Sequence, residues 1–160
     1  MKEYAKTARR GLALMAVAVL SLAPAIASAR SVEDPEEVSG FLAEAKTEAL
    51  QLQKSTEEMN SFEHSTINWR TEAAKIAEIK RHFNKLGELV IEMNKAEAPS
   101  PRQQQAIREV TPMVEELAIY ITMTIYHLGE NPDRLIFTSF PEYVAANAGL
   151  ASGIAQLLSH

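Results

Sequence analysis

Hydrophobic side chains recur along this chain at intervals of three and four residues in four separate stretches, with charged and amide side chains between them. That spacing places the apolar positions on one face of an α-helix. No stretch shows a convincing strand-like alternation of apolar and polar residues. The four stripes are Val38, Leu42, Ala45, Ala49, Leu52 and Met59; Trp69, Ala73, Ile76, Phe83, Leu86, Val90 and Met93; Ile107, Val110, Val114, Leu117, Ile121, Ile125 and Leu128; and Phe140, Tyr143, Val144, Asn147, Leu150, Ala151, Ile154, Leu157 and Leu158.

Three of the stripes begin with a helix-start signal. In each signal a capping side chain can accept a hydrogen bond from a free backbone N–H, and a Glu or Gln three residues later can bond back to it. A proline in the first turn strengthens each signal. The second stripe has no such signal, and Ser65, Thr66 or Asn68 can each serve as its cap. The three signals are Asp34-Pro35-Glu36-Glu37, Ser100-Pro101-Arg102-Gln103 and Ser139-Phe140-Pro141-Glu142.

The predicted fold is therefore all-α, an antiparallel up-down four-helix bundle with three long helices and a shorter fourth. Gly129 is expected to end the third helix in the left-handed conformation. The apolar residues 135–137 are expected to pack over one end of the core. Pro112 lies in the third helix, where it removes one backbone hydrogen bond, so a kink is predicted there. If that helix instead ends at Glu109, the bundle has five helices.

The first 29 residues have the order of segments that defines a secretory signal peptide: basic, then apolar, then small. The apolar run from Leu12 to Leu22 is shorter than the about 20 residues that a spanning helix needs, so cleavage is favoured over anchoring. Cleavage is predicted after Ala27-Ser28-Ala29, which leaves Arg30 as the first residue of a periplasmic or extracellular protein. The pair Arg9-Arg10 keeps twin-arginine export open as an alternative to the general route. The basic residues of the segment are Lys2, Lys6, Arg9 and Arg10.

Subtracting the signal makes the remaining domain clearly acidic. The segment removes four of the 16 basic residues and one of the 21 acidic ones. The remaining domain has 12 basic and 20 acidic residues, so the net charge changes from −5 to −8. This balance argues against nucleic acid and anionic lipid as partners, because both require a basic face. The partner expected is an unknown protein or small molecule, with no stable membrane insertion after cleavage.

The chain contains no cysteine. Disulfides, thiolate metal sites, cysteine nucleophiles and covalently attached c-type haem are therefore excluded. Residues 30–160 are long enough for one helical-bundle domain that is held together by its core.

Helical bundles can hold metals or haem, and this sequence offers few ligands for either. It has no Glu-x-x-His, the spacing of di-metal sites, so no metal site is predicted. Glu78 and His82, one turn apart, are interpreted as a solvated pair. His127 is the one candidate for cofactor binding, as an axial ligand of b-type haem with Met59, Met93, Met113 or Met123. The competing interpretation makes His127 a capping cation and the methionines core filler, so no cofactor is predicted.

The sequence contains no glycine-rich phosphate loop or nucleophile elbow, so no catalytic residue is predicted. His64 and His160, in a connection and at the terminus, are not ligand candidates. Trp69 is expected to anchor the second helix in the core, with its indole N–H bonded at the bundle end. The hydroxyls of Tyr120, Thr122, Thr124 and Tyr126 are expected to be satisfied within the fold.

The region from about 36 to 158 resembles a group of small exported bacterial helical proteins with no assigned activity. This resemblance implies export and a helical fold and no mechanism. It rests on Asn68-Trp69, Gln103-Gln104-Gln105-Ala106-Ile107, residues 124–128, Asn131, Arg134-Leu135, Pro141-Glu142-Tyr143 and Ala146-Asn147.

The leading functional hypothesis is an exported, non-enzymatic binding or interaction module of the cell envelope. The alternative is a bundle that holds b-type haem or a metal for electron transfer or sensing, and an exported hydrolase is the third.

Overall fold

The computed structural model describes residues 35–64, 69–96, 99–130, 132, 135 and 138–159. These contain four helices: α2 (Pro35–Asn60), α3 (Trp69–Lys95), α4 (Pro101–Glu130) and α5 (Phe140–Leu157). The prediction of an all-α four-helix fold is confirmed. The predicted signal segment, with the predicted processing residues Ala27, Ala29 and Arg30, lies outside the described residues.

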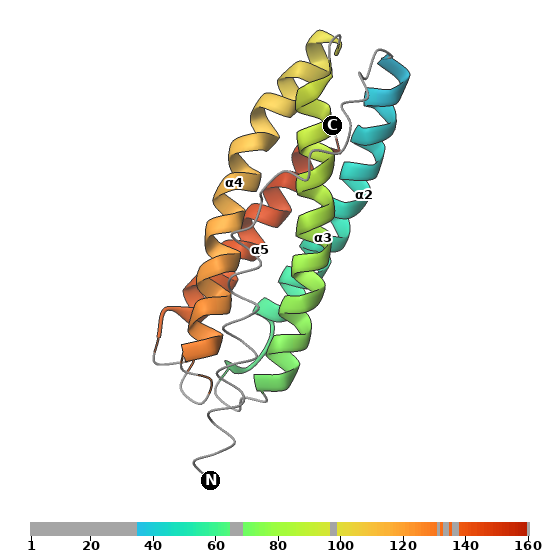
Figure 1. Ribbon diagram of the computed structural model, residues 1–160. Coiled ribbons are helices and arrows are strands. Elements are labelled where there is room, and N and C mark those ends of the chain that lie inside the picture. The colour runs from blue at the N-terminus through green and yellow to red at the C-terminus, as the bar shows by residue number, and fades with distance from the viewer. Residues whose placement is uncertain are drawn as a thin grey trace.

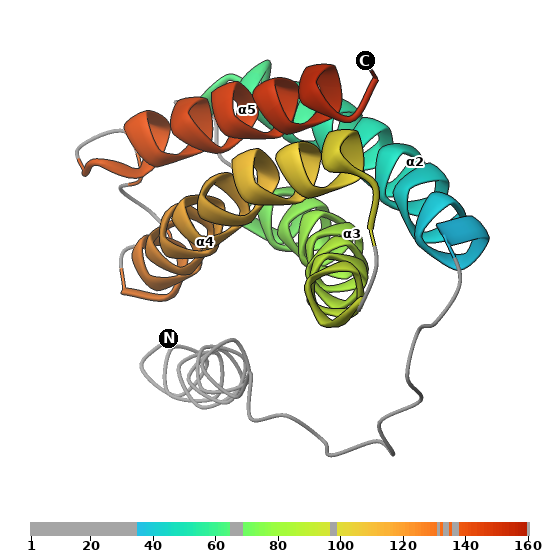
Figure 2. The same ribbon diagram turned by 90° about the horizontal axis from the view of Figure 1, so that it is seen from above.

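Successive helices run in opposite directions along the bundle (Figure 1). α2 and α4 descend in that view while α3 and α5 ascend, and the shorter α5 ends before the top of the other three. Viewed along the bundle, the helices follow one another around a common core in chain order (Figure 2). Two polar contacts join helices that are distant in sequence. Gln53 Nε2 of α2 donates to Ser152 Oγ of the adjacent α5 at 3.4 Å, and Gln103 Nε2 of α4 donates to Ser39 Oγ of α2 at 3.1 Å.

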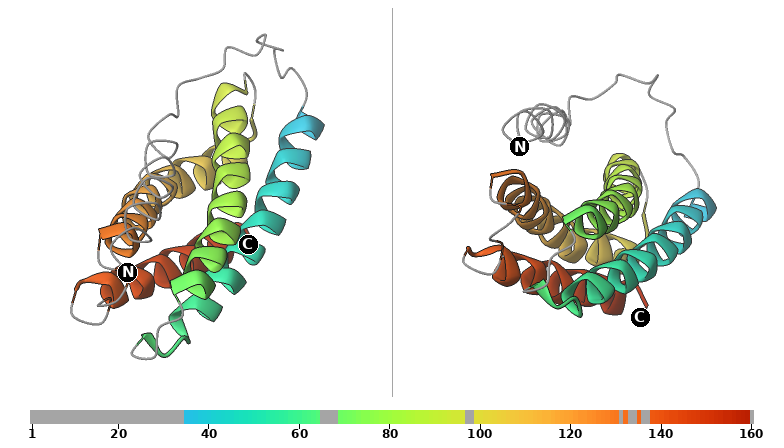
Figure 3. Two further views of the ribbon diagram at one scale, coloured as in Figure 1. Left: turned by 60° about the horizontal axis from the view of Figure 1, so that its bottom comes forward. Right: turned by 90° about the horizontal axis from the view of Figure 1, so that it is seen from below.

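The four neighbouring helix pairs do not pack equally. α2 packs extensively against α3 and α5, and α4 packs extensively against α5, whereas the contact between α3 and α4 is the smallest of the four. The axes of α3 and α4 lie close at the end where residues 96–100 connect them and diverge toward the other end (Figure 3). The bundle is therefore least closed between α3 and α4.

The core consists of the apolar stripes that the sequence shows, and its largest fully buried side chains come from all four helices. Leu135, in the connection between α4 and α5, is also fully buried in this core. This confirms the expected packing for Leu135, while Ile136 and Phe137 lie outside the described residues. Trp69 begins α3 and is half-buried against the core, as predicted, and the Arg70 guanidinium lies 5.4 Å from its ring centroid. The partner expected for the indole N–H stays a prediction.

The predicted capping box at the start of α4 is present. Gln103 N–H donates to Ser100 Oγ at 3.3 Å, and Ser100 N–H donates to Gln103 Oε1 at 2.7 Å. These two bonds satisfy backbone donors that the first turn of a helix leaves free. Asp34, the predicted cap of α2, lies outside the described residues.

Two predictions about helix ends are wrong. Ser139 precedes α5 but its side chain makes no capping bond. Its backbone is already close to helical, with φ −77° and ψ 11°, whereas a capping residue normally has an extended backbone. Thr138 Oγ1 accepts from Phe140 N–H at 3.1 Å instead. Gly129 is not left-handed either, because α4 continues through it to Glu130 and no described glycine has a positive φ.

Pro112 lies inside α4, which is one helix from Pro101 to Glu130. The alternative of a helix end at Glu109, and hence of five helices, is therefore wrong. The proline ring is exposed and its nitrogen carries no hydrogen, so the Arg108 carbonyl lacks its usual donor. The kink itself stays a prediction.

Candidate functional site

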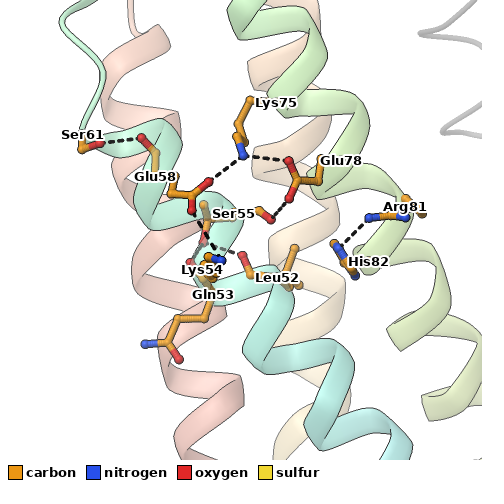
Figure 4. A network of polar contacts seen from close by, with 11 residues as sticks. Leu52, Gln53, Lys54, Ser55, Glu58, Ser61, Lys75, Glu78, Arg81 and His82 are labelled. Atoms are coloured by element: carbon orange, nitrogen blue, oxygen red, sulfur yellow. Dashed lines mark hydrogen bonds and ion pairs between the residues drawn. The ribbon is translucent and has the colours of Figure 1, made fainter.

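A row of polar contacts joins α2 to α3 along their length. At its centre, Lys75 Nζ donates to Glu58 Oε2 and to Glu78 Oε2, both at 2.7 Å, and Ser55 Oγ donates to Glu78 Oε1 at 2.8 Å (Figure 4). The hydrogen bond to Glu58 is the main cause that raises the pKa of Lys75. The hydrogen bond from Lys75, followed by that from Ser55, lowers the pKa of Glu78. Each group therefore holds its neighbour in the charged form.

Further along the same row, His82 Nδ1 donates to Glu48 Oε2 at 2.7 Å, and Lys85 Nζ lies 3.7 Å from Glu44 Oε2. The predicted solvated pair of Glu78 and His82 is wrong, since each bonds a different partner. His82 is largely buried in this contact between the helices. The row fixes the register of α2 against α3, and its carboxylates already have hydrogen-bonding or ion-pairing partners within the chain.

A buried hydrogen bond links the connection after α2 to the first turn of α3. His64 Nδ1 donates to Glu72 Oε1 at 2.8 Å, and the two side chains are only 10% and 4% exposed. The His64 ring also meets the Phe140 ring edge-on, with centroids 5.3 Å apart. Glu72 Oε2 is buried without a hydrogen-bond partner. His64 therefore connects the end of α2 to the first turns of α3 and α5.

Sequence reasoning missed this contact. Glu72 lies four residues before Ile76, so it occupies a position of the apolar stripe, and a charged residue there signals a buried partner. The partner itself gives no local signal, because His64 comes from the connection that precedes α3.

Neutral groups join α4 to α5. Thr124 Oγ1 donates to the Tyr120 carbonyl at 2.7 Å and accepts from Asn147 Nδ2 at 2.9 Å. Thr122 Oγ1 donates to the Ala118 carbonyl at 2.7 Å, so both threonine hydroxyls are satisfied within the fold as expected. Asn147 is buried in this contact and its Oδ1 has no partner.

His127, the predicted cofactor candidate, lies beside this neutral contact. Its ring stacks on Tyr143 at 5.3 Å and meets Tyr126 edge-on at 5.5 Å. Its Nδ1 is buried and makes no hydrogen bond. Met59 and Met93 are buried in the core, and Met113 packs against it. Within the described ranges, no three His, Cys, Asp or Glu residues gather where they could hold a metal ion.

Large hydrophobic side chains are exposed at four described positions, and three of them lie on α3 or α4. Ile119 is 62% exposed, Tyr126 53% and Ile91 40%; the fourth, Leu50, is on α2 and 45% exposed. Ile119 and Tyr126 are seven residues apart and therefore share one face of α4.

One hydrogen bond shows how α3 and α4 align. Asn94 Nδ2 of α3 donates to Thr111 Oγ1 of α4 at 3.1 Å. The two helices are antiparallel, and seven residues make two helical turns. Gly87, seven residues before Asn94, therefore lies at the level of Ala118, seven residues after Thr111. Ile91 lies between Asn94 and Gly87 on this side of α3, and Ile119 follows Ala118. We call the surface made by Gly87, Ile91, Ala118, Ile119, Thr122 and Tyr126 the α3–α4 face.

The charges near this face differ from those of the α2–α3 row. α4 has no Asp, Glu, Lys or Arg between Glu116 and Glu130. Glu88 and Glu115, next to Gly87 and one turn before Ile119, are exposed, and neither forms an ion pair with a described residue. The face is therefore apolar along α4 with two unpaired carboxylates near its middle.

Comparison of the chain with protein-family models, curated proteins and solved structures finds no match to any of them. None of the described helices combines the length and the apolar character needed to cross a membrane.

Proposed function

We propose that this protein is an exported, non-enzymatic binding module of the cell envelope, and that the α3–α4 face is its recognition surface. The observation that carries the proposal is the exposure of Ile119 and Tyr126 on the uncharged length of α4. Burying such a side chain is worth about 1.5–3 kcal/mol, which this fold leaves unused. A partner that covers them gains that free energy, and tyrosine is enriched at the centres of protein interfaces.

The α2–α3 row supports the choice of face by contrast. Its carboxylates Glu58, Glu78 and Glu48 already have basic partners within the chain, so a binding partner would have to displace them. Among the described residues of α3 and α4, the hydrogen bond between side chains of the two helices at the α3–α4 face is the one from Asn94 to Thr111 at its end.

The export part of the proposal rests on the sequence of residues 1–29. Amino-terminal sequencing of the protein from the envelope fraction tests it. A chain that begins at Arg30 supports export with cleavage, and a cytoplasmic chain that retains residues 1–29 contradicts it.

The recognition surface is tested by placing a photo-reactive amino acid at position 119, 126 or 50 in living cells. Leu50 is the matched control, since it is similarly exposed but lies on α2. We expect one discrete crosslinked product from positions 119 and 126 and none from position 50. No product from 119 or 126, or the same product from all three positions, overturns the proposal.

The alternative, a bundle that holds b-type haem or a metal, is supported by one observation, the buried Nδ1 of His127 without a partner. Both the stacked Tyr143 and the edge-on Tyr126 limit access to that ring. The test is the visible spectrum and metal content of the protein purified from its native compartment. A Soret band or stoichiometric metal that is lost on His127→Ala establishes the alternative, and neither signal in the unsubstituted protein excludes it.

A further inference from the structure

The α3–α4 face has a spacing that suits a helix. The axes of α3 and α4 diverge from their connected end (Figure 3). The register of Asn94 and Thr111 puts Gly87 at the level of Ala118, and a Cβ atom added to Gly87 would meet no heavy atom within 4 Å. The surface is therefore open at Gly87.

Backbone pairing cannot provide recognition here. The N–H and C=O groups in the middle of both helices are used within the helices, so a partner strand finds no edge to extend. Recognition must come from side chains. Ile119 and Tyr126 are two helical turns apart, about 10.5 Å, which is also the repeat of an apolar ridge on an amphipathic helix.

The charged residues around the face indicate which charge a partner should carry at its middle. Glu88 and Glu115 flank the apolar centre without ion pairs to the described residues. Lys80 lies eight residues before Glu88 on α3 and Arg108 seven residues before Glu115 on α4, toward opposite ends of the face. A partner with positive charge at its middle complements the two carboxylates and keeps clear of the two cations.

Resting on the proposed function, we infer that the partner segment is an amphipathic α-helix. Its apolar ridge contacts Ile91, Ile119 and Tyr126, and Lys or Arg side chains in its central turns pair with Glu88 and Glu115. This helix lies between α3 and α4 and extends the bundle by one member. The acidic character of residues 30–160, 12 basic against 20 acidic side chains, also favours encounter with a basic segment.

The test uses two synthetic helices of about 18 residues, or about five turns, built from Leu, Ala and Gln. Both have one leucine ridge, and they differ only in two central positions, which are Lys in one peptide and Glu in the other. Binding of the labelled peptides to the purified protein is measured by fluorescence anisotropy. We expect the Lys peptide to bind at least about tenfold more tightly than the Glu peptide, the effect of roughly one well-formed charge contact.

Matched variants of the protein show where the peptide binds. The double substitution Ile119→Ser with Tyr126→Ser should weaken binding by at least about tenfold, as for residues at an interface centre. The control Leu50→Ser should leave it unchanged. Glu88→Gln with Glu115→Gln should remove the preference for the Lys peptide, whereas Glu57→Gln with Glu142→Gln removes the same number of exposed charges elsewhere and should preserve it.

Circular dichroism and Trp69 fluorescence verify that each variant is folded. Equal binding of the two peptides, or binding that the face substitutions leave unchanged, overturns the inference. So does a natural partner crosslinked at position 119 through a segment that is not a basic helix, and that result leaves the proposed function intact. If no crosslink forms at position 119 or 126, both this inference and the proposed recognition surface are overturned.

Discussion

In the α2–α3 hairpin, carboxylates of one helix meet cations of the other at several levels, from Glu58 and Lys75 to Glu44 and Lys85. In the α4–α5 hairpin the contacts are neutral: Thr124 with Asn147, and Tyr143 with Tyr120 and His127. No ion pair joins α4 to α5 in the part of the chain that the structure describes. The two hairpins of the bundle thus hold their helices together with different kinds of polar contact, charged in one and uncharged hydrogen bonds and ring contacts in the other.

The difference bears on function. Where charges are paired across helices, they fix register and leave a solvated, self-sufficient outer surface. Where the helix contact is neutral, α4 carries no Asp, Glu, Lys or Arg between Glu116 and Glu130, and its outer surface exposes Ile119 and Tyr126. This contrast supports the proposal that the α3–α4 face, rather than the α2–α3 row, is the recognition surface. Each of the following substitutions tests one side of that comparison.

The largest effect is expected from breaking the buried contact at the α2–α3 turn. His64→Ala removes the hydrogen bond that Glu72 Oε1 makes with His64, and a buried polar group left without a partner costs about 1–3 kcal/mol. The imidazole contact with Phe140 is lost as well. Chemical denaturation monitored by Trp69 fluorescence measures the change in the free energy of unfolding.

The double variant His64→Ala with Glu72→Gln is the control for that substitution. It replaces the carboxyl group that His64→Ala leaves without this hydrogen bond by a neutral amide, so we expect the double variant to be more stable than the single variant. If the single variant is as stable as the unsubstituted protein, the turn does not depend on this pair.

An opposite effect is expected from Pro112 in α4. Pro112→Ala restores the backbone N–H that the Arg108 carbonyl lacks. Proline in a helix interior costs about 3 kcal/mol, but it also restricts the unfolded chain, which offsets about 1 kcal/mol. We expect the free energy of unfolding to rise by about 1–2 kcal/mol. A loss of stability would show that a bend at Pro112 is needed for the packing of α4.

The fold could be predicted from the sequence because its signals are local. The apolar stripes and the Ser100–Gln103 box depend only on residues within one or two turns, and the structure confirms them. Ser139 failed as a cap because its own backbone is already close to helical, and Thr138 Oγ1 accepts from Phe140 N–H instead. Gly129 failed because a glycine permits a left-handed helix end and does not require one.

The site residues were harder to predict because their roles depend on contacts between helices. His64 gains its partner Glu72 only when the chain returns after α2, and His82 selects Glu48 from α2 over Glu78 from its own helix. Ile119 and Tyr126 stand out only by their exposure, which requires knowing which face of α4 is covered. His127 was singled out from the sequence, and its role as a cofactor ligand stays the alternative interpretation.

A smaller effect is expected at the centre of the charged row. Lys75→Met leaves Glu58 and Glu78 without their shared cation and should cost about 1 kcal/mol near pH 7, since the pair is partly exposed. Adding salt should reduce the difference, because screening weakens the contact that the variant lacks. Lys54→Met is the control: Lys54 lies 4.0 Å from Glu58 but is highly exposed, so little change is expected.

The same pair gives a pH dependence with a definite sign. The pKa of Glu78 is lowered in the folded state, so its stabilisation is present above the ordinary value of 4.5 and is lost as the pH falls through the folded value. The pKa of Lys75 is raised, so its contribution is present below 10.5 and is lost as the pH rises above that value. Unfolding measured across this range should show both losses in the unsubstituted protein, and Lys75→Met should flatten both. An unchanged profile would mean that the row is not what makes the α2–α3 hairpin sensitive to pH.

The smallest effect tests packing in the neutral hairpin, with two glycines of α5. Alanine is preferred over glycine inside a helix by about 0.5–1 kcal/mol. At Gly149 the new Cβ meets no heavy atom within 4 Å, so Gly149→Ala should stabilise the protein by nearly this amount. At Gly153 the new Cβ would lie 2.6 Å from Met113 Cε, so this side chain must move, and the gain should be smaller. Because the Met113 end is flexible, Gly153→Ala should not unfold the protein.

Thermal unfolding of both variants measures the difference in stability between them. Since helix propensity is the same in both, this difference reports how closely α4 and α5 pack at Gly153. If Gly153→Ala stabilises the protein as much as Gly149→Ala does, α4 and α5 are packed loosely at Gly153. Shape complementarity would then contribute less to the stability of this hairpin than the neutral hydrogen bond between Thr124 and Asn147.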